Sequence, residues 1–274
     1  WWNEALHGVA RAGRATVFPQ AIGMAATFND LLINKVADAI SDEARAKFNA
    51  AVKNNNRSQY LGLTFWSPNI NIFRDPRWGR GHETYGEDPY LTGRIGTAFV
   101  KGLQGNNPSY YKTVACAKHF AVHSGPEPLR HEFNAVVSNN DLRNTYLPAF
   151  KTLVTEAKVG GIMCAYNRVD SLPCCTGKFL LQDILRNEWN FKGYVVTDCW
   201  ALDDIFRYHK FVKTDEEVAA LAIKANVNVE CGNTLKALQG ALNKGLVTQK
   251  EIDASLKINL TALFKLGLFD AADK

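Results

Sequence analysis

An acidic residue ends one of the most apolar runs of the chain. Residues 194–197 read Tyr-Val-Val-Thr, which is typical of a buried strand, and Asp198 follows them directly. The last side chain of a parallel strand lies at the carboxyl rim of its sheet, where barrel enzymes gather their reactive groups. We therefore predict that Asp198 is a nucleophile.

Polar side chains at other places along the chain could join this carboxylate. They are Glu4, Arg80, Lys118 with His119, and Tyr166. Most of them follow an apolar segment, so a single rim of a parallel sheet could collect them all. Taken alone, a Tyr or an acid after a strand is more often a turn residue or a helix cap, so the prediction depends on their convergence.

The elements that must position these residues follow from the apolar pattern. Short apolar runs alternate with longer segments of helical period, which indicates βα units and a mostly parallel sheet. We predict strands at 16–18, 63–66, 113–118, 161–166, 194–197 and 227–230. We predict helices at 31–52, 89–103, 141–158, 179–189 and 216–225, and further helices over 234–266 that close the domain.

This pattern predicts an α/β fold, specifically a (β/α)8 TIM-type barrel. Six strands are fewer than the eight of a complete barrel, so either the first strand precedes Trp1 or the barrel is irregular. A doubly wound open sheet is the competing architecture. No repeat or long linker interrupts the pattern, and we treat 1–274 as one domain.

Composition and charge exclude several classes of partner. The formal net charge of +5 is small for 274 residues, and the basic residues are interspersed with 27 acids, so we expect no nucleic-acid partner. No apolar run approaches the ~20 residues of a membrane span, so we expect no membrane partner. A nucleotide-binding domain would need a Gly-rich phosphate loop after the first strand, and none is present.

The six cysteines are too few for a disulfide scaffold. Cys116, Cys164 and Cys199 lie in or beside apolar runs, where buried free thiols are expected. A bridge between Cys199 and Cys231 stays open as an alternative, because both end strand-like runs. No Cys or His cluster has zinc spacing, and we predict no metal and no cofactor.

Ordered motifs spread over most of the chain carry a family resemblance. They are the segments 74–80 (RDPRWGR), 85–90 (YGEDPY), 117–120 (AKHF), 163–168 (MCAYNR) and 195–198 (VVTD). Together they resemble glycoside hydrolase family 3, the family of β-glucosidases and β-xylosidases, and specifically its barrel domain. The resemblance implies a retaining mechanism in which Asp198 attacks the anomeric carbon and a second acid protonates the departing oxygen.

The resemblance also assigns the sugar-binding residues. It implies that Lys118 and His119 donate hydrogen bonds to hydroxyls of the glycone, that Arg80 and Arg130 bind further hydroxyls, and that Tyr166 lies close to the nucleophile. Consecutive strand residues point to opposite faces, so Lys118 and His119 can reach one sugar only if the backbone leaves regular β geometry. We therefore predict a local distortion at 118–120, such as a cis non-proline peptide.

Glu4 indicates which sugar is preferred. It occupies the place where many β-glucosidases of the family carry Asp, and one extra methylene moves the carboxylate inward by ~1.5 Å. That shift intrudes on the volume of a glucose hydroxymethyl group, which xylose lacks. The segment 2–8 also looks like the xylosidase and arabinofuranosidase branch, so we predict a β-D-xylosidase acting on oligosaccharides or glycosides, with a β-glucosidase of the same family as the alternative.

No second carboxylate of the chain qualifies as the acid/base. The available acids are Glu127, Glu132, Asp170, Asp203, Asp204 and Glu230. The resemblance implies that a following α/β sandwich domain, absent from this chain, supplies the proton donor. Polysaccharide-directed relatives imply a secreted or periplasmic location.

One branch of the family, the β-N-acetylglucosaminidases, uses an Asp-His pair on a loop after Lys-His. His131 falls at a suitable distance, but Leu129 stands where that motif has Asp, so His131 lacks a partner carboxylate and we reject this branch. A hypothesis from another class is a sugar-binding domain without catalysis, in which the same residues hold a monosaccharide.

Overall fold

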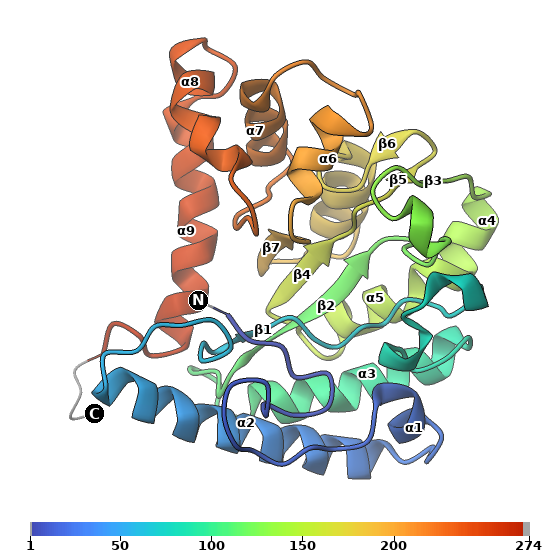
Figure 1. Cartoon of the computed structure of the whole chain (residues 1–274), viewed down its shortest axis with the longest axis vertical. Helices are drawn as coiled ribbons and strands as arrows, with labels where there is room; N and C mark the ends of the chain where they lie inside the picture. The colour runs from blue at the N-terminus through green and yellow to red at the C-terminus, as the bar shows by residue number, and fades with distance from the viewer. Residues whose placement is uncertain (1, 271–274) are drawn as a thin grey trace.

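A curled sheet of four parallel strands forms the centre of the molecule (Figure 1). The computed structural model describes residues 2–270. The strands are β1 (Thr64–Phe65), β2 (Val114–Phe120), β4 (Gly161–Cys164) and β7 (Tyr194–Thr197), hydrogen-bonded in that order. Single parallel bridges from Asn3 to Phe65 and from Val196 to Val229 continue the curl at its two edges. The sheet is therefore an incomplete barrel, which confirms the predicted α/β barrel with an irregular strand set.

The helices surround this sheet in chain order. They are α1 (Ala21–Ala25), α2 (Asp30–Lys53), η1 (Pro76–Trp78), η2 (Gly81–Glu83), α3 (Pro89–Gln104), η3 (Glu127–Leu129), α4 (Asn139–Asp141), η4 (Leu142–Tyr146), α5 (Pro148–Thr155), η5 (Phe179–Glu188), α6 (Ala201–Arg207), α7 (Asp215–Lys224), η6 (Thr234–Ala237), α8 (Leu238–Asn243) and α9 (Gln249–Lys265). Side chains of Asn29 and Asp88 cap α2 and α3 by accepting backbone N–H groups.

Three of the predicted elements differ from the structure. The predicted helix 141–158 is divided, because Pro148 has no N–H to continue the hydrogen bonding and instead begins α5. The predicted strand 16–18 is wrong, because the Thr16 N–H donates to the carboxylate of Glu43 and not to a neighbouring strand. The predicted strand 227–230 is reduced to the single bridge at Val229.

Both faces of the central sheet are buried. Alternate strand residues such as Ala115, Ala117 and Ile162 pack in the large core beneath the outer helices. The strand residues between them face the inside of the curl and pack with Ala262 of α9. They are Val114, Cys116, Met163 and Val196. The near-continuous apolar character of the strands follows from this double burial. Helix α9 lies to the side of β7 (Figure 1).

A second, smaller sheet ties two rim loops together. It consists of β3 (Asn134–Ala135), β5 (Arg168–Val169) and β6 (Leu172–Pro173). Because β3 pairs with β5, the loop that precedes β3 is held beside the segment that follows β4. Among the described residues, no helix combines the length and the apolar character needed to cross a bilayer.

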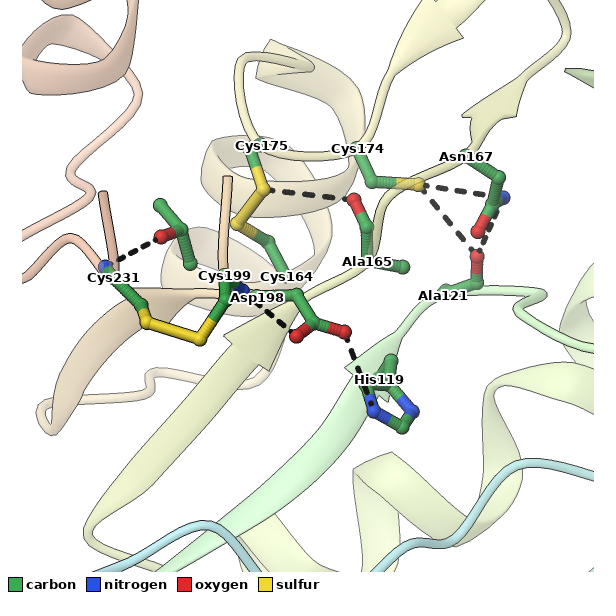
Figure 2. The surroundings of a disulfide bond; sticks show 11 residues. His119, Ala121, Cys164, Ala165, Asn167, Cys174, Cys175, Asp198, Cys199 and Cys231 are labelled. Carbon is green, nitrogen blue, oxygen red and sulfur yellow. Dashed lines mark hydrogen bonds and ion pairs between the residues drawn. A yellow bond between two sulfur atoms is a disulfide. The ribbon is translucent and has the colours of Figure 1, made fainter. Parts of the chain in front are cut away.

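Two disulfides lie at the rim of the central sheet (Figure 2). The bridge between Cys199 and Cys231, left open by the sequence, is present. A second bridge joins Cys164 to Cys175, so the expectation of free thiols is wrong for Cys164 and Cys199 and holds for Cys116. Cys164 ends β4, and Cys175 follows the small sheet 11 residues later.

Candidate active site

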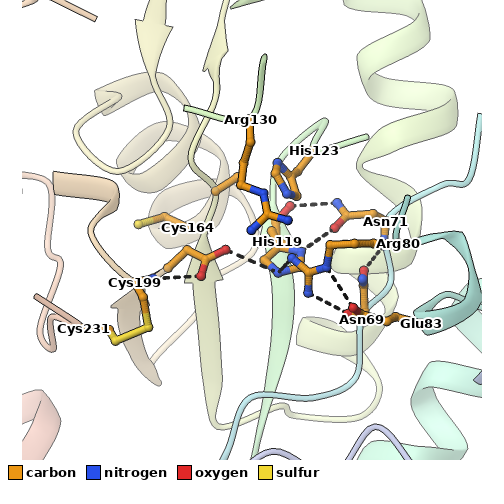
Figure 3. A network of polar contacts seen from close by, with 12 residues as sticks. Asn69, Asn71, Arg80, Glu83, His119, His123, Arg130, Cys164, Cys199 and Cys231 are labelled. Carbon is orange, nitrogen blue, oxygen red and sulfur yellow. Dashed lines mark hydrogen bonds and ion pairs between the residues drawn. A yellow bond between two sulfur atoms is a disulfide. The ribbon is translucent and has the colours of Figure 1, made fainter. Parts of the chain in front are cut away.

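The predicted site residues meet at the carboxyl rim of the central sheet. Asp198 follows β7, Lys118 and His119 lie in β2, and Arg80 immediately precedes η2. Tyr166 lies in a bend two residues after the end of β4. Figure 3 shows Arg80, Asn71 and Glu83 around His119, with Arg130 on the opposite side of the group.

Asp198 is buried, and its two carboxylate oxygens have different surroundings. Oδ1 accepts the backbone N–H of Cys199 at 2.8 Å, whereas Oδ2 lies 3.5 Å from His119 Nε2 and has no hydrogen-bond partner among the described residues. Burial raises the pKa of Asp198, and the nearby cations of Lys118 and Arg80 partly oppose this effect. The Cys199 N–H and the Tyr166 hydroxyl also favour the charged carboxylate. The result is a shielded acid with one oxygen available for chemistry.

Asn71 determines the proton position on His119. Its Oδ1 lies 2.8 Å from His119 Nδ1 and also accepts the His119 backbone N–H, while its Nδ2 donates to the His119 carbonyl. An amide oxygen can only accept, so Nδ1 carries the proton. Nε2 then accepts from Arg80 at 3.2 Å. Burial, followed by the charge of Arg80, holds the pKa of His119 well below its ordinary value, and the ring is neutral.

This geometry indicates a different role for His119 from the donation to a sugar hydroxyl that the resemblance implies. A neutral ring whose Nδ1–H is committed to Asn71 offers a lone pair at Nε2, so His119 accepts a hydrogen bond at the site instead of donating one. The donors in this group are Arg80 and Lys118.

Glu83, which was not among the predicted site residues, also belongs to the site. Its carboxylate binds Arg80 through two hydrogen bonds of 2.9 and 2.6 Å. Burial raises the pKa of Glu83, but the contact with Arg80 outweighs burial and the pKa lies below its ordinary value. Burial lowers the pKa of Arg80, and the pairing with Glu83 more than offsets this. The pair aims the guanidinium at His119.

Lys118 is buried in the middle of these charges. Burial and the charge of Arg80 lower its pKa, while the carboxylates of Glu4, Glu83 and Asp198 raise it. The net pKa is below the ordinary value.

The backbone at this point departs from regular strand geometry, as predicted. The Lys118–His119 and Phe120–Ala121 peptide bonds are both cis, and the pairing of β2 with β4 changes register between Ala117 and Phe120. The consecutive residues Lys118 and His119 both act on Asp198, because the His119 ring lies 3.5 Å from its carboxylate and the charge of Lys118 lowers its pKa.

Tyr166 and Arg130 lie on another side of the site. Tyr166 is buried, and burial, followed by the charge of Asp198, raises its pKa, so its hydroxyl keeps its proton. The Arg130 guanidinium lies 5.9 Å from the Tyr166 ring centroid and pairs with Glu127.

Glu4 borders a cavity beside this group. The cavity has a volume of about 450 Å³ and is lined by Glu4, Arg11, His82 and Glu83 among others. The Glu4 carboxylate pairs with Arg11. The charge of Glu4 raises the pKa of Lys118, so Glu4 lies close enough to interact electrostatically with the site.

The ligand atoms of His119, His123 and Asp198 lie within 4.8 Å of one another and resemble a metal site in composition. The environment does not suit a divalent cation. Arg80 occupies His119 Nε2, and the ammonium of Lys118 adds a second positive charge. Repulsion from these cations disfavours a metal ion here.

Most of the candidate acids have protein partners. Asp203 pairs with Arg207, Asp170 accepts a backbone N–H, and Glu230 caps the N–H groups of Thr234 and Leu235. The expectation that His131 lacks a partner carboxylate is wrong. Its Nδ1 lies 2.8 Å from Oδ2 of Asp204, a residue 73 positions later that no local motif could connect to it.

Comparisons with known proteins agree with this geometry. A family model described as the glycosyl hydrolase family 3 N terminal domain matches residues 1–261. A xylan 1,4-beta-xylosidase of Xylanibacter ruminicola is 50% identical over 276 residues, which cover 98% of this chain and 32% of that protein.

Two solved structures are similar to the whole chain. A GH3 exo-beta-xylosidase (XlnD) in complex with a xylobiose aziridine probe has a TM-score of 0.90 and 32% identity, over 100% of this chain and 36% of that one. A beta-glucosidase from Erythrobacter marinus has a TM-score of 0.89 and 33% identity, over 98% and 35%. The chain therefore spans about a third of the length of these relatives.

Proposed function

This chain belongs to glycosyl hydrolase family 3, and we propose that it is the nucleophile-bearing, sugar-binding domain of a retaining β-D-xylosidase. The observation that carries the proposal is the carboxylate of Asp198. It is buried beside Lys118 and Arg80, and its Oδ2 is free of hydrogen-bond partners among the described residues.

In the first step, Oδ2 of Asp198 bonds to the anomeric carbon as the bond from that carbon to the leaving oxygen breaks. The positive charges of Lys118 and Arg80 favour the ionised form of the attacking carboxylate and partly oppose the effect of its burial. The Tyr166 hydroxyl lies close to the carboxylate of Asp198 and also favours its charged form. Water then hydrolyses the covalent glycosyl intermediate with retention of configuration.

Substrate hydroxyls are held by groups of complementary polarity. Lys118, Arg80 and Arg130 donate, and His119 Nε2 accepts when a sugar hydroxyl replaces Arg80 as its partner. The arginine forks can each hold two acceptors. Such a site binds a pyranose with several hydroxyls and no net charge.

The preference for xylose rests on Glu4. Its carboxylate reaches ~1.5 Å further than an Asp would, into the volume that the hydroxymethyl group of glucose needs. The similarity to relatives named xylosidases supports this choice. The likeness to a β-glucosidase of nearly the same TM-score makes glucosides the competing substrates.

The proton donor belongs, in our proposal, to a further domain of the whole protein. The relatives are about three times as long as this chain, which covers 32% of the Xylanibacter protein. We also propose an oxidising compartment such as the periplasm or the exterior, because the fold contains two disulfides.

Covalent trapping tests the proposal. We expect 2-deoxy-2-fluoro-β-D-xylosyl fluoride, whose leaving group needs no proton, to label the protein once and to place the added mass on the peptide containing Asp198. Asp198→Gly should abolish the label and leave xylose binding in place. Xylose binding without label or turnover would instead support a sugar-binding domain without catalysis.

A further inference from the structure

A second acid–histidine pair lies behind the wall of the site. His131 is next to Arg130 on the loop that follows η3, and Asp204 lies in α6, the helix that begins shortly after Asp198. The 2.8 Å contact between His131 Nδ1 and Asp204 Oδ2 joins this loop to this helix. The Asp204 side chain is 2% exposed, whereas the His131 side chain is 45% exposed.

The His131 ring packs on the residue that contacts the nucleophile. Its centroid lies 5.0 Å from that of Tyr166 at an interplanar angle of 70°, an edge-to-face arrangement. On its other side it lies 5.6 Å from the ring of Tyr208. Arg130 lies over the same Tyr166 ring. Consecutive residues of one loop therefore border Tyr166, whose hydroxyl is at Asp198.

Electrostatics explain why Asp204 needs this partner. The pKa of Asp204 is raised to about 6, chiefly by burial, and the charges of Asp203 and Asp198 act in the same direction. The hydrogen bond and charge of His131 oppose them. The charge of Asp203 is paired with Arg207. The group that pairs with the Asp204 carboxylate is His131.

We propose that His131 and Asp204 form a positioning pair that holds Arg130 and Tyr166 in place against Asp198. This inference rests on the proposed glycosidase function and assigns no proton transfer to the pair. The contact between Asp204 and His131 fixes the position of the loop. The loop in turn fixes the positions of Arg130 and of the Tyr166 ring, and Tyr166 orients the attacking carboxylate. Loss of the pair should therefore slow the attack of Asp198 whatever group departs.

The test uses three variants and one matched control. Asp204→Ala removes the partner, Asp204→Asn keeps an oxygen that can accept from His131, and His131→Phe keeps a ring without N–H groups. Asp183→Asn, which alters an exposed ion pair with Lys178, is the control. For each we would measure kcat and KM with dinitrophenyl β-D-xyloside and with xylosides of poorer leaving groups, and verify folding by circular dichroism.

We expect Asp204→Ala and His131→Phe to lower kcat ~10- to 100-fold by misplacing the reacting groups, to a similar extent for every leaving group. We expect Asp204→Asn to restore activity to within a few-fold of the parent. Folded Asp204→Ala and His131→Phe proteins that were as active as Asp183→Asn would overturn the positioning role. A loss that grows as the leaving group worsens would also overturn it, because that dependence is the signature of a proton donor.

Xylose binding separates this inference from the proposed function. If the parent protein binds xylose but cleaves no activated xyloside, the proposed hydrolase function of the chain fails. The pair is still tested, because a displaced Arg130 should weaken xylose binding in Asp204→Ala and spare it in Asp204→Asn. Equal affinity for xylose in the parent and in both variants would then contradict the positioning role of His131 and Asp204.

Discussion

Two buried carboxylates lie against histidines in this molecule, and they are partnered in opposite ways. Asp198 Oδ2 lies 3.5 Å from His119 Nε2, whose lone pair already accepts from Arg80. Asp204 Oδ2 makes a direct 2.8 Å contact with the ring of His131. The first acid keeps one oxygen without a hydrogen-bond partner among the described residues, and the second has a histidine as its partner.

The difference indicates that burial alone does not make an acid reactive. Burial raises the pKa of both carboxylates. At Asp198 nearby cations support the charge without occupying Oδ2, so that oxygen remains available to a carbon atom. At Asp204 the oxygen is committed to a side chain of the protein, so the acid holds structure in place. The predictions below test this contrast.

Removing the carboxylate charge should separate the two acids most strongly. We expect Asp198→Asn to lower kcat for dinitrophenyl xyloside by more than about 10⁴-fold, because a neutral amide is not a competent nucleophile. The same change at Asp204 should cost only a few-fold. Steady-state kinetics of the two variants measure the contrast. Comparable losses at both positions would show that the two acids are not distinguished by their partners.

Removing a cation should alter the pH dependence of Asp198. The Lys118 ammonium lowers the pKa of that carboxyl, so in Lys118→Met the pKa rises. The acid limb of the profile of kcat/KM against pH should therefore move to higher pH, with a loss of ~10²- to 10³-fold in rate as one charged donor disappears. Lys112→Met, at a surface lysine paired with Asp38 and Asp42, is the control and should leave the limb unchanged. An unmoved limb in Lys118→Met would mean that Lys118 does not act on the nucleophile.

The smallest effect concerns the choice of sugar. We expect Glu4→Asp to raise the ratio of kcat/KM for glucoside over xyloside by ~10- to 200-fold at most, because a shorter side chain frees the volume of one hydroxymethyl group. The ratio for a pair of dinitrophenyl glycosides measures it directly. An unchanged ratio would exclude Glu4 as the residue that selects xylose.

Local sequence predicted the parts of the site that lie at strand ends. The apolar run before Asp198 has the same bounds as β7, Tyr194–Thr197, because a strand buried on both faces needs an unbroken apolar sequence. The distortion at Lys118 and His119 was predictable only with the family resemblance, which assigns both residues to one ligand that adjacent strand residues cannot otherwise face.

Partners that are distant in sequence were not predictable in this way. The pair of Arg80 and Glu83 is local, but its contact with His119 is not, because only the fold of the segment after β1 brings Arg80 to a residue 39 positions later. Asp204 reads as one of several helix acids, and its contact with His131 depends on the docking of α6 against the loop that follows η3.

By itself, the sequence determined the alternation of strands and helices, the family motifs and the residues that end at the rim, because period and turn chemistry are local properties. Only the tertiary structure decided which cysteines are joined and which ring nitrogen of His119 carries the proton. It also decided which acid has an oxygen without a hydrogen-bond partner among the described residues. The bridge between Cys199 and Cys231 and the contact between His119 and Asn71 join residues 32 and 48 positions apart, and such contacts form only when the sheet curls and its loops pack together.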